Sequence, residues 1–204
     1  MTEESPNIPP IPNPPPVQPS PPSSDEGQAF VQALKDAVDF LKLDFSNLDR
    51  VANDPKMPVW VIVILAISGV ASAIGTFNIP GIIINPIFSV IFGSVFILLF
   101  WVLAGPIFGG KATVIQHYNS LGLLAVVQWI TVIPILGPLV SFLLMFYLVF
   151  VYQRLIKVLH SLSEGKAWAV VLIPIAVMFF LGLILIAIFG IAIFGFIAAA
   201  ANSG

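Results

Sequence analysis

The residues that could support chemistry in this chain gather in two glycine-bearing turns, and the first reads GPIFGGK. This segment is close to the phosphate-binding pattern G-x-x-x-x-G-K-[ST], in which backbone amides and the lysine hold phosphate groups. Ala112 stands where the pattern needs a hydroxyl for magnesium, and an apolar run precedes the turn where the pattern needs a strand. We therefore interpret Gly109, Gly110 and Lys111 as a flexible cytoplasmic turn and a candidate interaction site, not as a nucleotide site.

The two histidines, His117 and His160, lie near the same turns, and the second turn, Glu164-Gly165-Lys166, follows His160 closely. The pair could sense protons or hold a metal ion, but two imidazoles without a carboxylate make a weak metal site. The favoured interpretation places both histidines at the interfacial ends of helices, where His160 would complement a helix C-terminus. Both histidines and the second turn join the candidate cytoplasmic interaction residues.

Composition argues against catalysis. The chain has no cysteine, and it shows no zinc motif and no Ser/His/Asp set. Its apolar runs contain no Asp, Glu, Lys or Arg, whereas pumps and proton relays normally need ionisable groups within the membrane. We predict a non-enzyme without catalytic residues, bound metal or cofactor. The net charge of −2 leaves no broad basic face, so we expect no nucleic-acid partner.

The chain has the composition of a membrane protein. Of its 204 residues 58% are hydrophobic and 9% are charged, whereas soluble domains carry about 25% charged residues. A spanning helix needs about 20 apolar residues. We predict an all-α, polytopic membrane bundle of five transmembrane helices. The five expected spans cover about Val59 to Gly75, Ile87 to Pro106, Ser120 to Leu136, Leu139 to Gln153 and Ala167 to Ala201.

The third and fourth runs are at the short end of the spanning range. A break at Pro134, Gly137 and Pro138 joins them into a hairpin. The segments 120–136 and 139–153 therefore either cross the membrane fully or form a re-entrant hairpin, and the sequence leaves both alternatives open.

Three regions follow from the patterning. Residues 1–22 hold ten of the eighteen prolines, and we predict a disordered, Pro-rich cytoplasmic tail because such a segment cannot bury enough surface to offset its entropy. Residues 23–56 form a predicted amphipathic, interfacial helix region, and residues 57–204 form the transmembrane domain. The helix places Asp36 on its polar side. Its apolar face is expected to consist of Phe30, Leu34, Val38, Leu41 and Phe45.

The cations decide the expected orientation. With five spans and a cytoplasmic N-terminus, every lysine and arginine falls on the cytoplasmic side, as the positive-inside rule requires. The C-terminus is then outside. These eight cations are Lys35, Lys42, Arg50, Lys56, Lys111, Arg154, Lys157 and Lys166.

Small residues four apart, such as Gly69 and Ala73 in the first span, let helices approach closely. Packing inside the bundle is the favoured role of this pair. A homo-oligomer formed through such a face is left open.

The stretch from Phe108 to Val171 resembles the Yip (Ypt/Rab-interacting protein) domain family, in its prokaryotic-type branch. The resemblance rests on the GGK turn, on His117-Tyr118, on the segment IPILGP that begins at Ile133, and on LHSLSEGKA, which begins at Leu159. It implies five membrane helices, a cytoplasmic N-terminus and a prokaryotic plasma membrane. Eukaryotic relatives bind Rab-type GTPases and act in trafficking, but their DLYGP segment is absent here, so no GTPase-contacting residue is carried over.

The leading functional hypothesis is an integral membrane scaffold or adaptor in the lipid bilayer, whose cytoplasmic face recruits a protein partner or organises the membrane. The alternative is a permease or channel for a small neutral solute, motivated by the Pro134–Pro138 hairpin and by the polar residues Gln128 and Thr131. A third, weaker hypothesis is a lipid-handling protein, because the bundle is so apolar.

Overall fold

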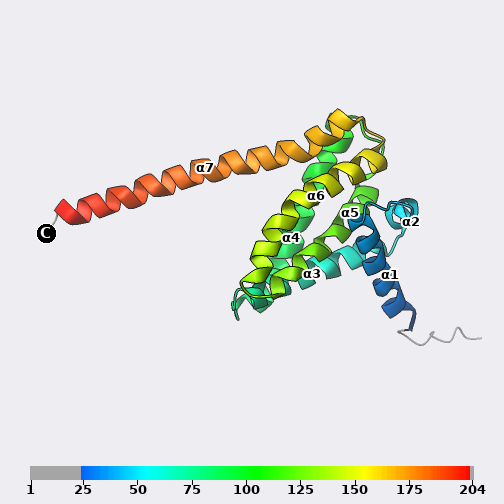
Figure 1. The fold of residues 1–204 in the computed structure, drawn as a ribbon, viewed down its shortest axis with the longest axis horizontal. Helices are drawn as coiled ribbons and strands as arrows, with labels where there is room; N and C mark the ends of the chain where they lie inside the picture. Colours follow the sequence, from blue (N-terminus) through cyan, green and yellow to red (C-terminus); the bar gives the residue numbers. More distant parts are fainter. Residues whose placement is uncertain (1–23, 203–204) are drawn as a thin grey trace, which may run out of the picture.

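The computed structural model describes residues 24–202, and within them the fold is all-α (Figure 1). The Pro-rich tail predicted over residues 1–22 lies outside the described residues. A 3₁₀ helix and one turn of π-helix interrupt the α-helices. The elements are α1 (Ser24–Leu41), α2 (Leu48–Asn53), α3 (Met57–Gly75), α4 (Gly81–Val102), the π-helix η1 (Leu103–Ile107), α5 (Val114–Gly122), the 3₁₀ helix η2 (Leu123–Val132), α6 (Leu136–His160) and α7 (Glu164–Asn202).

Four helices are long and apolar enough to cross a membrane. They match four of the five expected spans. The second begins at Gly81, six residues before the expected Ile87, because Pro86 is accommodated inside α4 instead of preceding it. The candidate spans are Met57–Gly75, Gly81–Ile107, Leu139–His160 and Glu164–Phe189.

The remaining expected span, over 120–136, is not one long α-helix but α5 continued by η2. At about 1.5 Å per residue in α-helix and about 2.0 Å in 3₁₀ helix, α5 and η2 together extend about 34 Å, of which the part from Ser120 onward covers about 25 Å, compared with ~30 Å of hydrocarbon in a bilayer. Asn119 bonds the chain just before α3. At the other end of α3, a Cβ on Gly75 would overlap the Thr131 carbonyl oxygen. The segment therefore reaches as far as α3 does.

Helices α3 and α4 approach closely at a small residue. A Cβ on Gly69 would lie 2.5 Å from the Asn85 carbonyl oxygen and from the Pro86 nitrogen, so only glycine fits there. Ala73, one turn later, is also fully buried. The predicted role of Gly69 and Ala73 in packing inside the bundle is confirmed.

Helix α1 is amphipathic, and four of the five residues of the predicted apolar face, Phe30, Leu34, Leu41 and Phe45, pack partly buried against the core. Ala33, Ala37 and Phe40 are fully buried, whereas Val38 is 44% exposed. The two alanines let α1 lie close to its neighbours, which rotates the larger Val38 outward. Asp36, which was expected on the polar face, is also buried.

Helix α7 leaves the other helices after its first turns and runs outward alone (Figure 1). Ala167, Val170 and Val171 are fully buried near its start. The helix continues through Pro174 to Asn202, so the proline does not end it.

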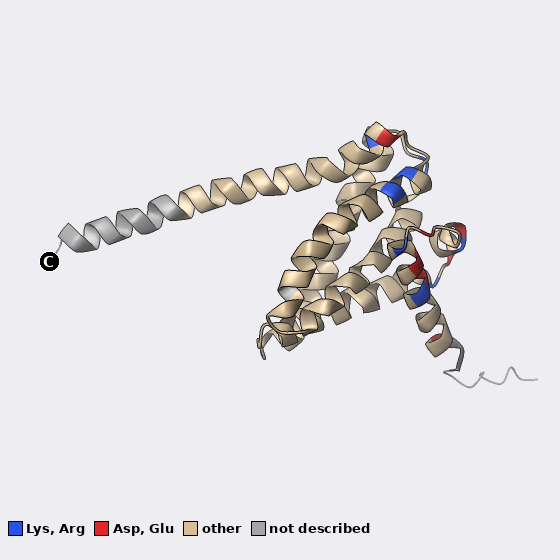
Figure 2. Cartoon of the chain, viewed as in Figure 1, with Lys and Arg blue, Asp and Glu red and all other residues tan. Residues whose placement is uncertain are grey.

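Charged residues gather at one end of the molecule. Figure 2 shows Lys, Arg, Asp and Glu on α1 and α2 and around the junction of α6 with α7, while the opposite end of the bundle is uncharged. The uncharged end contains the α3–α4 turn and the turn between η2 and α6.

Candidate functional site

The GGK turn is built by the π-helix that ends the second span. The Phe108 amide donates to the Leu103 carbonyl oxygen, and the Gly110 amide donates to Ala104 at 2.8 Å. Gly109 has a φ of +78°, a left-handed conformation that glycine adopts without strain. Gly110 is required for space, because a Cβ there would overlap the His160 ring. The two glycines of the motif are therefore required for different reasons, Gly109 for its backbone conformation and Gly110 for the space beside His160.

The two predicted turns lie side by side. The Lys111 amide donates to the His160 carbonyl oxygen at 3.2 Å, and Lys166 Nζ donates to the Phe108 carbonyl oxygen at 2.9 Å. Within the second turn, Glu164 is exposed and forms an ion pair with Lys157 at 2.7 Å. Gly165 is exposed, with open space around its Cα.

The two histidines form a direct hydrogen bond. His117 Nδ1 lies 2.8 Å from His160 Nε2, and both side chains are fully buried. One ring nitrogen must donate and the other must accept, so the bond requires that the facing nitrogens are not both protonated. The pair joins α5 to the last residue of α6. Sequence reasoning considered such a pair but favoured helix-end histidines at the interface.

A metal site at the histidine pair would need further ligands. Among the described residues there is no group of three or more His, Cys, Asp or Glu side chains that could hold a metal ion. At a separation of 2.8 Å the facing nitrogens of His117 and His160 bond to one another. The bond therefore connects two helices. The other ring nitrogens, His117 Nε2 and His160 Nδ1, are buried and have no hydrogen-bond partner in the described part of the chain.

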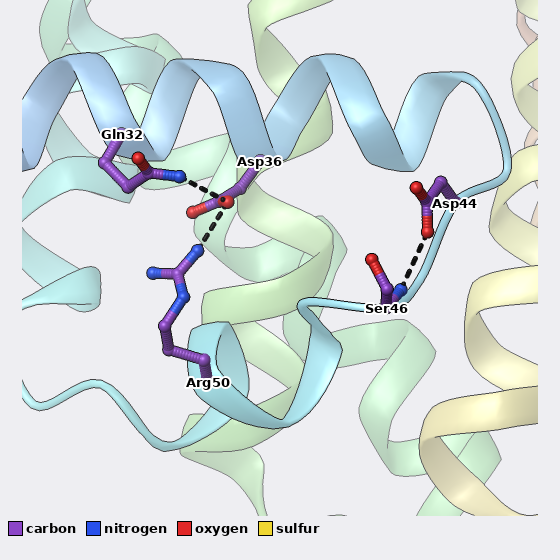
Figure 3. A network of polar contacts seen from close by, with 5 residues as sticks. All are labelled: Gln32, Asp36, Asp44, Ser46 and Arg50. Carbon is purple, nitrogen blue, oxygen red and sulfur yellow. Dashed lines mark hydrogen bonds and ion pairs between the residues drawn. The ribbon is translucent and has the colours of Figure 1, made fainter.

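Sequence reasoning missed an ion pair between the buried Asp36 of α1 and the half-exposed Arg50 of α2 (Figure 3). Asp36 Oδ1 accepts hydrogen bonds from the Arg50 guanidinium and, at 3.1 Å, from Gln32 Nε2. The signal for it was weak: Asp36 lies beside Ala33 and Ala37, the small residues along which α1 packs. In the same view, the Ser46 amide donates to Asp44, which lowers the pKa of that carboxyl.

Further bonds tie α1 and α2 to the bundle. Asn119 of α5 donates to the Ala52 carbonyl oxygen at 3.0 Å, and Gln116 donates to Asn53 at 2.9 Å. Tyr147 of α6 donates to the Leu41 carbonyl oxygen at 2.5 Å. The amphipathic region is therefore part of the folded bundle end, and we call α1, α2 and the two turns the charged platform.

The predicted hairpin break lies at the opposite, uncharged end. Pro134 precedes Ile135, whose φ of +66° reverses the chain, and Pro138 is in the first turn of α6. Gly137 packs so closely on the end of η2 that a Cβ would lie 2.5 Å from the Ile130 carbonyl oxygen. The break is therefore remote from the charged platform.

A groove opens between α3 and α4 and reaches one of the two polar residues that motivated the solute hypothesis. Its polar part has a volume of about 300 Å³ and includes Gln128. Thr131 and Pro134 do not line it. Thr131 instead donates to the Gln128 carbonyl oxygen at 2.6 Å.

No protein-family model, curated protein or solved structure matches this chain. The resemblance to the Yip family therefore stays a prediction. What can be said of the chain's chemistry comes from its own geometry.

Proposed function

We propose that the chain is an integral membrane scaffold whose charged platform recruits a protein partner on the cytoplasmic side. The observation that carries the proposal is the attachment of α1 and α2 to the bundle. A helix that only floated on the bilayer would not need an ion pair at the buried Asp36 or the bonds from Asn119 and Tyr147. Fixed in this way, α1 presents a defined surface.

The proposed membrane arrangement has five crossings. Four are the candidate spans. The fifth is α5 continued by η2, because the 3₁₀ helix rises more per residue than an α-helix and so extends further for the same number of residues. With Lys111 and Lys166 side by side, the positive-inside rule places the platform in the cytoplasm.

The exposed surface of the platform favours a protein over an anionic polymer or membrane surface. Lys35, Lys42 and Lys56 are exposed, and so are the acidic Glu26 and Asp49. Mixed charges of both signs give little attraction to anionic lipid or nucleic acid, which bind single-sign basic surfaces. They can give orientation and specificity in a protein interface.

The proposal includes kinship with the prokaryotic-type Yip proteins as its second part. Support comes from three of the four quoted motifs, because the GGK turn, the histidines and the SEGK turn meet at one place, whereas the IPILGP segment lies at the opposite end. Binding of a Rab-type GTPase is not part of the proposal.

Site-specific photo-crosslinking in native membranes tests the scaffold proposal. A photoreactive amino acid at Lys35, on the exposed side of α1, should give a discrete protein adduct, while the same residue at Phe77, at the uncharged end, should not. Arg50→Ala should weaken the adduct because it releases α1, and Lys42→Ala, which removes only an exposed ion pair of 3.6 Å with Asp39, should not. Equal labelling at both positions, or an adduct indifferent to Arg50, would contradict the proposal.

A further inference from the structure

The groove between α3 and α4 has a polar part and an apolar part. The polar part, of about 300 Å³, is lined by Ser68, Ser72, Asn85, Ser89 and Gln128 together with two phenylalanines. An adjoining part of about 570 Å³ shares Ser89 and Gln128 and continues along α4, where its lining is mainly apolar. Pockets of this size lie within the range of small-molecule and lipid sites.

The polar side chains of this groove have unused hydrogen-bonding capacity. Among the polar side chains that line the groove, only that of Ser68 makes hydrogen bonds within the described part of the chain. Its hydroxyl lies 2.8 Å from the Ile64 carbonyl oxygen and 3.0 Å from that of Ala125. The side chains of Ser72, Asn85, Ser89 and Gln128 make no hydrogen bond to the described part of the chain. Within a bilayer, polar side chains without a hydrogen-bond partner are unfavourable. An occupant that brings its own donors and acceptors is therefore favoured over plain hydrocarbon.

The order of the two parts along α4 matches an amphiphile. Asn85 lies one turn from Gly81, the first residue of α4 at the uncharged end, and the apolar part extends inward to Leu99. The fourteen residue steps from Asn85 to Leu99 rise about 21 Å along α4, which is more than the ~15 Å of hydrocarbon in one leaflet. One acyl chain that runs inward from a head at Asn85 therefore fits within the length of the groove.

We propose that this groove binds an uncharged lipid of the far leaflet, with a hydroxyl- or ester-bearing head at Asn85 and Gln128 and one acyl chain along α4. The head is uncharged because no lysine or arginine lines the groove, and all eight of the chain's cations belong to the other end or its platform. The binding site is independent of the proposed scaffold function.

The other described parts of the chain do not supply the missing partners. Helix α7 contributes Met178 to the apolar part, but between Trp168 and Asn202 its sequence contains no side chain that donates or accepts a hydrogen bond strongly. The phenylalanines Phe88 and Phe92 flank the polar part, and each is more than half exposed.

Photo-labelling of the full chain in phosphatidylcholine vesicles tests this proposal. The probe is a monoacylglycerol with a diazirine in its acyl chain, and its adducts are located by mass spectrometry. We expect adducts concentrated between Gly93 and Leu99 and at Met178, and we expect competition by unlabelled monoolein but not by phosphatidylglycerol. Asn85→Leu and Gln128→Leu should each weaken competition by about threefold, the size of an average side-chain hydrogen bond in a membrane protein.

Ser94→Ala is the matched control, because it removes a polar group of α4 that lies outside the groove and bonds Tyr118 at 2.9 Å. It should leave labelling unchanged. Adducts spread evenly over the groove and the exposed residues of α6, such as Phe142 and Phe146, would show that the probe labels the protein only as surrounding bilayer lipid. This result would overturn the proposal. So would competition by free glycerol alone, which indicates a water-borne solute, or labelled protein dimers crosslinked through α4, which indicate a second copy.

Discussion

The two ends of the bundle are held together by different means. At the charged end, named side chains make the connections: His117 with His160, Asp36 with Arg50, and Asn119 with the backbone before α3. At the uncharged end, the helices are joined by close backbone packing. Gly75 and Gly137 make this possible because a Cβ at either position would overlap the carbonyl oxygen of Thr131 or Ile130. The side-chain bonds described at the uncharged end are local, such as Asn78 Oδ1 accepting from the Gly81 amide. The charged end is thus joined by polar contacts between helices, and the uncharged end mainly by close backbone contacts.

The largest effect should come from closing the contact at the uncharged end. Gly75→Ala places a Cβ on the Thr131 carbonyl oxygen, so η2 must move, and we expect a loss of about 3 kcal/mol in unfolding free energy. Unfolding of the purified protein in mixed micelles measures it. Gly165→Ala, at a position with open space, is the control and should not destabilise. A Gly75→Ala protein as stable as the parent would show that the ends do not differ.

At the charged end, Arg50→Ala should have the next largest effect. It leaves the buried Asp36 carboxylate without its cation, and breaking a buried pair is strongly destabilising. Because Arg50 is about half exposed (47%), we expect only about 2 kcal/mol. Adding Asp36→Ala should recover part of the loss, and strict additivity of the two changes in a double-mutant cycle would argue against the pair.

The histidine pair should contribute somewhat less. His117→Leu fills much of the same space but leaves His160 buried without its partner, for which we expect a loss of about 1.5 kcal/mol. The same unfolding assay measures it. His117→Leu combined with His160→Leu should be less destabilising than the single change, because both polar groups are then removed. An equal or larger loss in the double variant would indicate a role other than the mutual bond.

The smallest effect concerns pH at the loop between α1 and α2. The Ser46 amide lowers the pKa of Asp44 below its usual value, so the folded protein binds this proton less readily than the unfolded chain. The stabilisation is complete above the unfolded pKa of about 3.9 and is lost as pH falls through the lower folded pKa. Asp44→Asn should therefore reduce the slope of stability against pH below about 4. An unchanged slope would show that Asp44 does not contribute.

The sequence was informative where free energies are large. Charge within hydrocarbon is so costly that the charge-free stretches from Met57 to Gly110 and from Leu139 to Gln153 could be assigned to the membrane, and three of the candidate spans cover them. The resulting segregation of cations also predicted that the Lys111 and Lys166 turns share one end.

The remaining features of the fold depend on contacts between distant residues, which the hydrophobic and charge patterns of the sequence do not reveal. The 3₁₀ winding of Leu123–Val132 follows from its packing between α3 and α6, not from residue type. The burial of Asp36 depended on Arg50, fourteen residues away. The predicted helix face was wrong at Val38, which is exposed, because the buried Ala33 and Ala37 make the closest contacts of α1. The polar lining of the groove comes from three separate segments, α3, α4 and η2, so no single stretch of sequence shows it.

The most direct test of the account is the accessibility of single cysteines, which the chain permits because it has none of its own. Lys111→Cys, Lys166→Cys and Ile135→Cys, the last at an 87% exposed position in the hairpin turn, are expressed in cells and treated with a membrane-impermeant thiol reagent. We predict that Ile135→Cys reacts from outside intact cells, and that the two turn positions react only after the membrane is opened. Reaction of Lys111→Cys and Lys166→Cys from opposite sides, or of Ile135→Cys from the same side as both, would contradict the account.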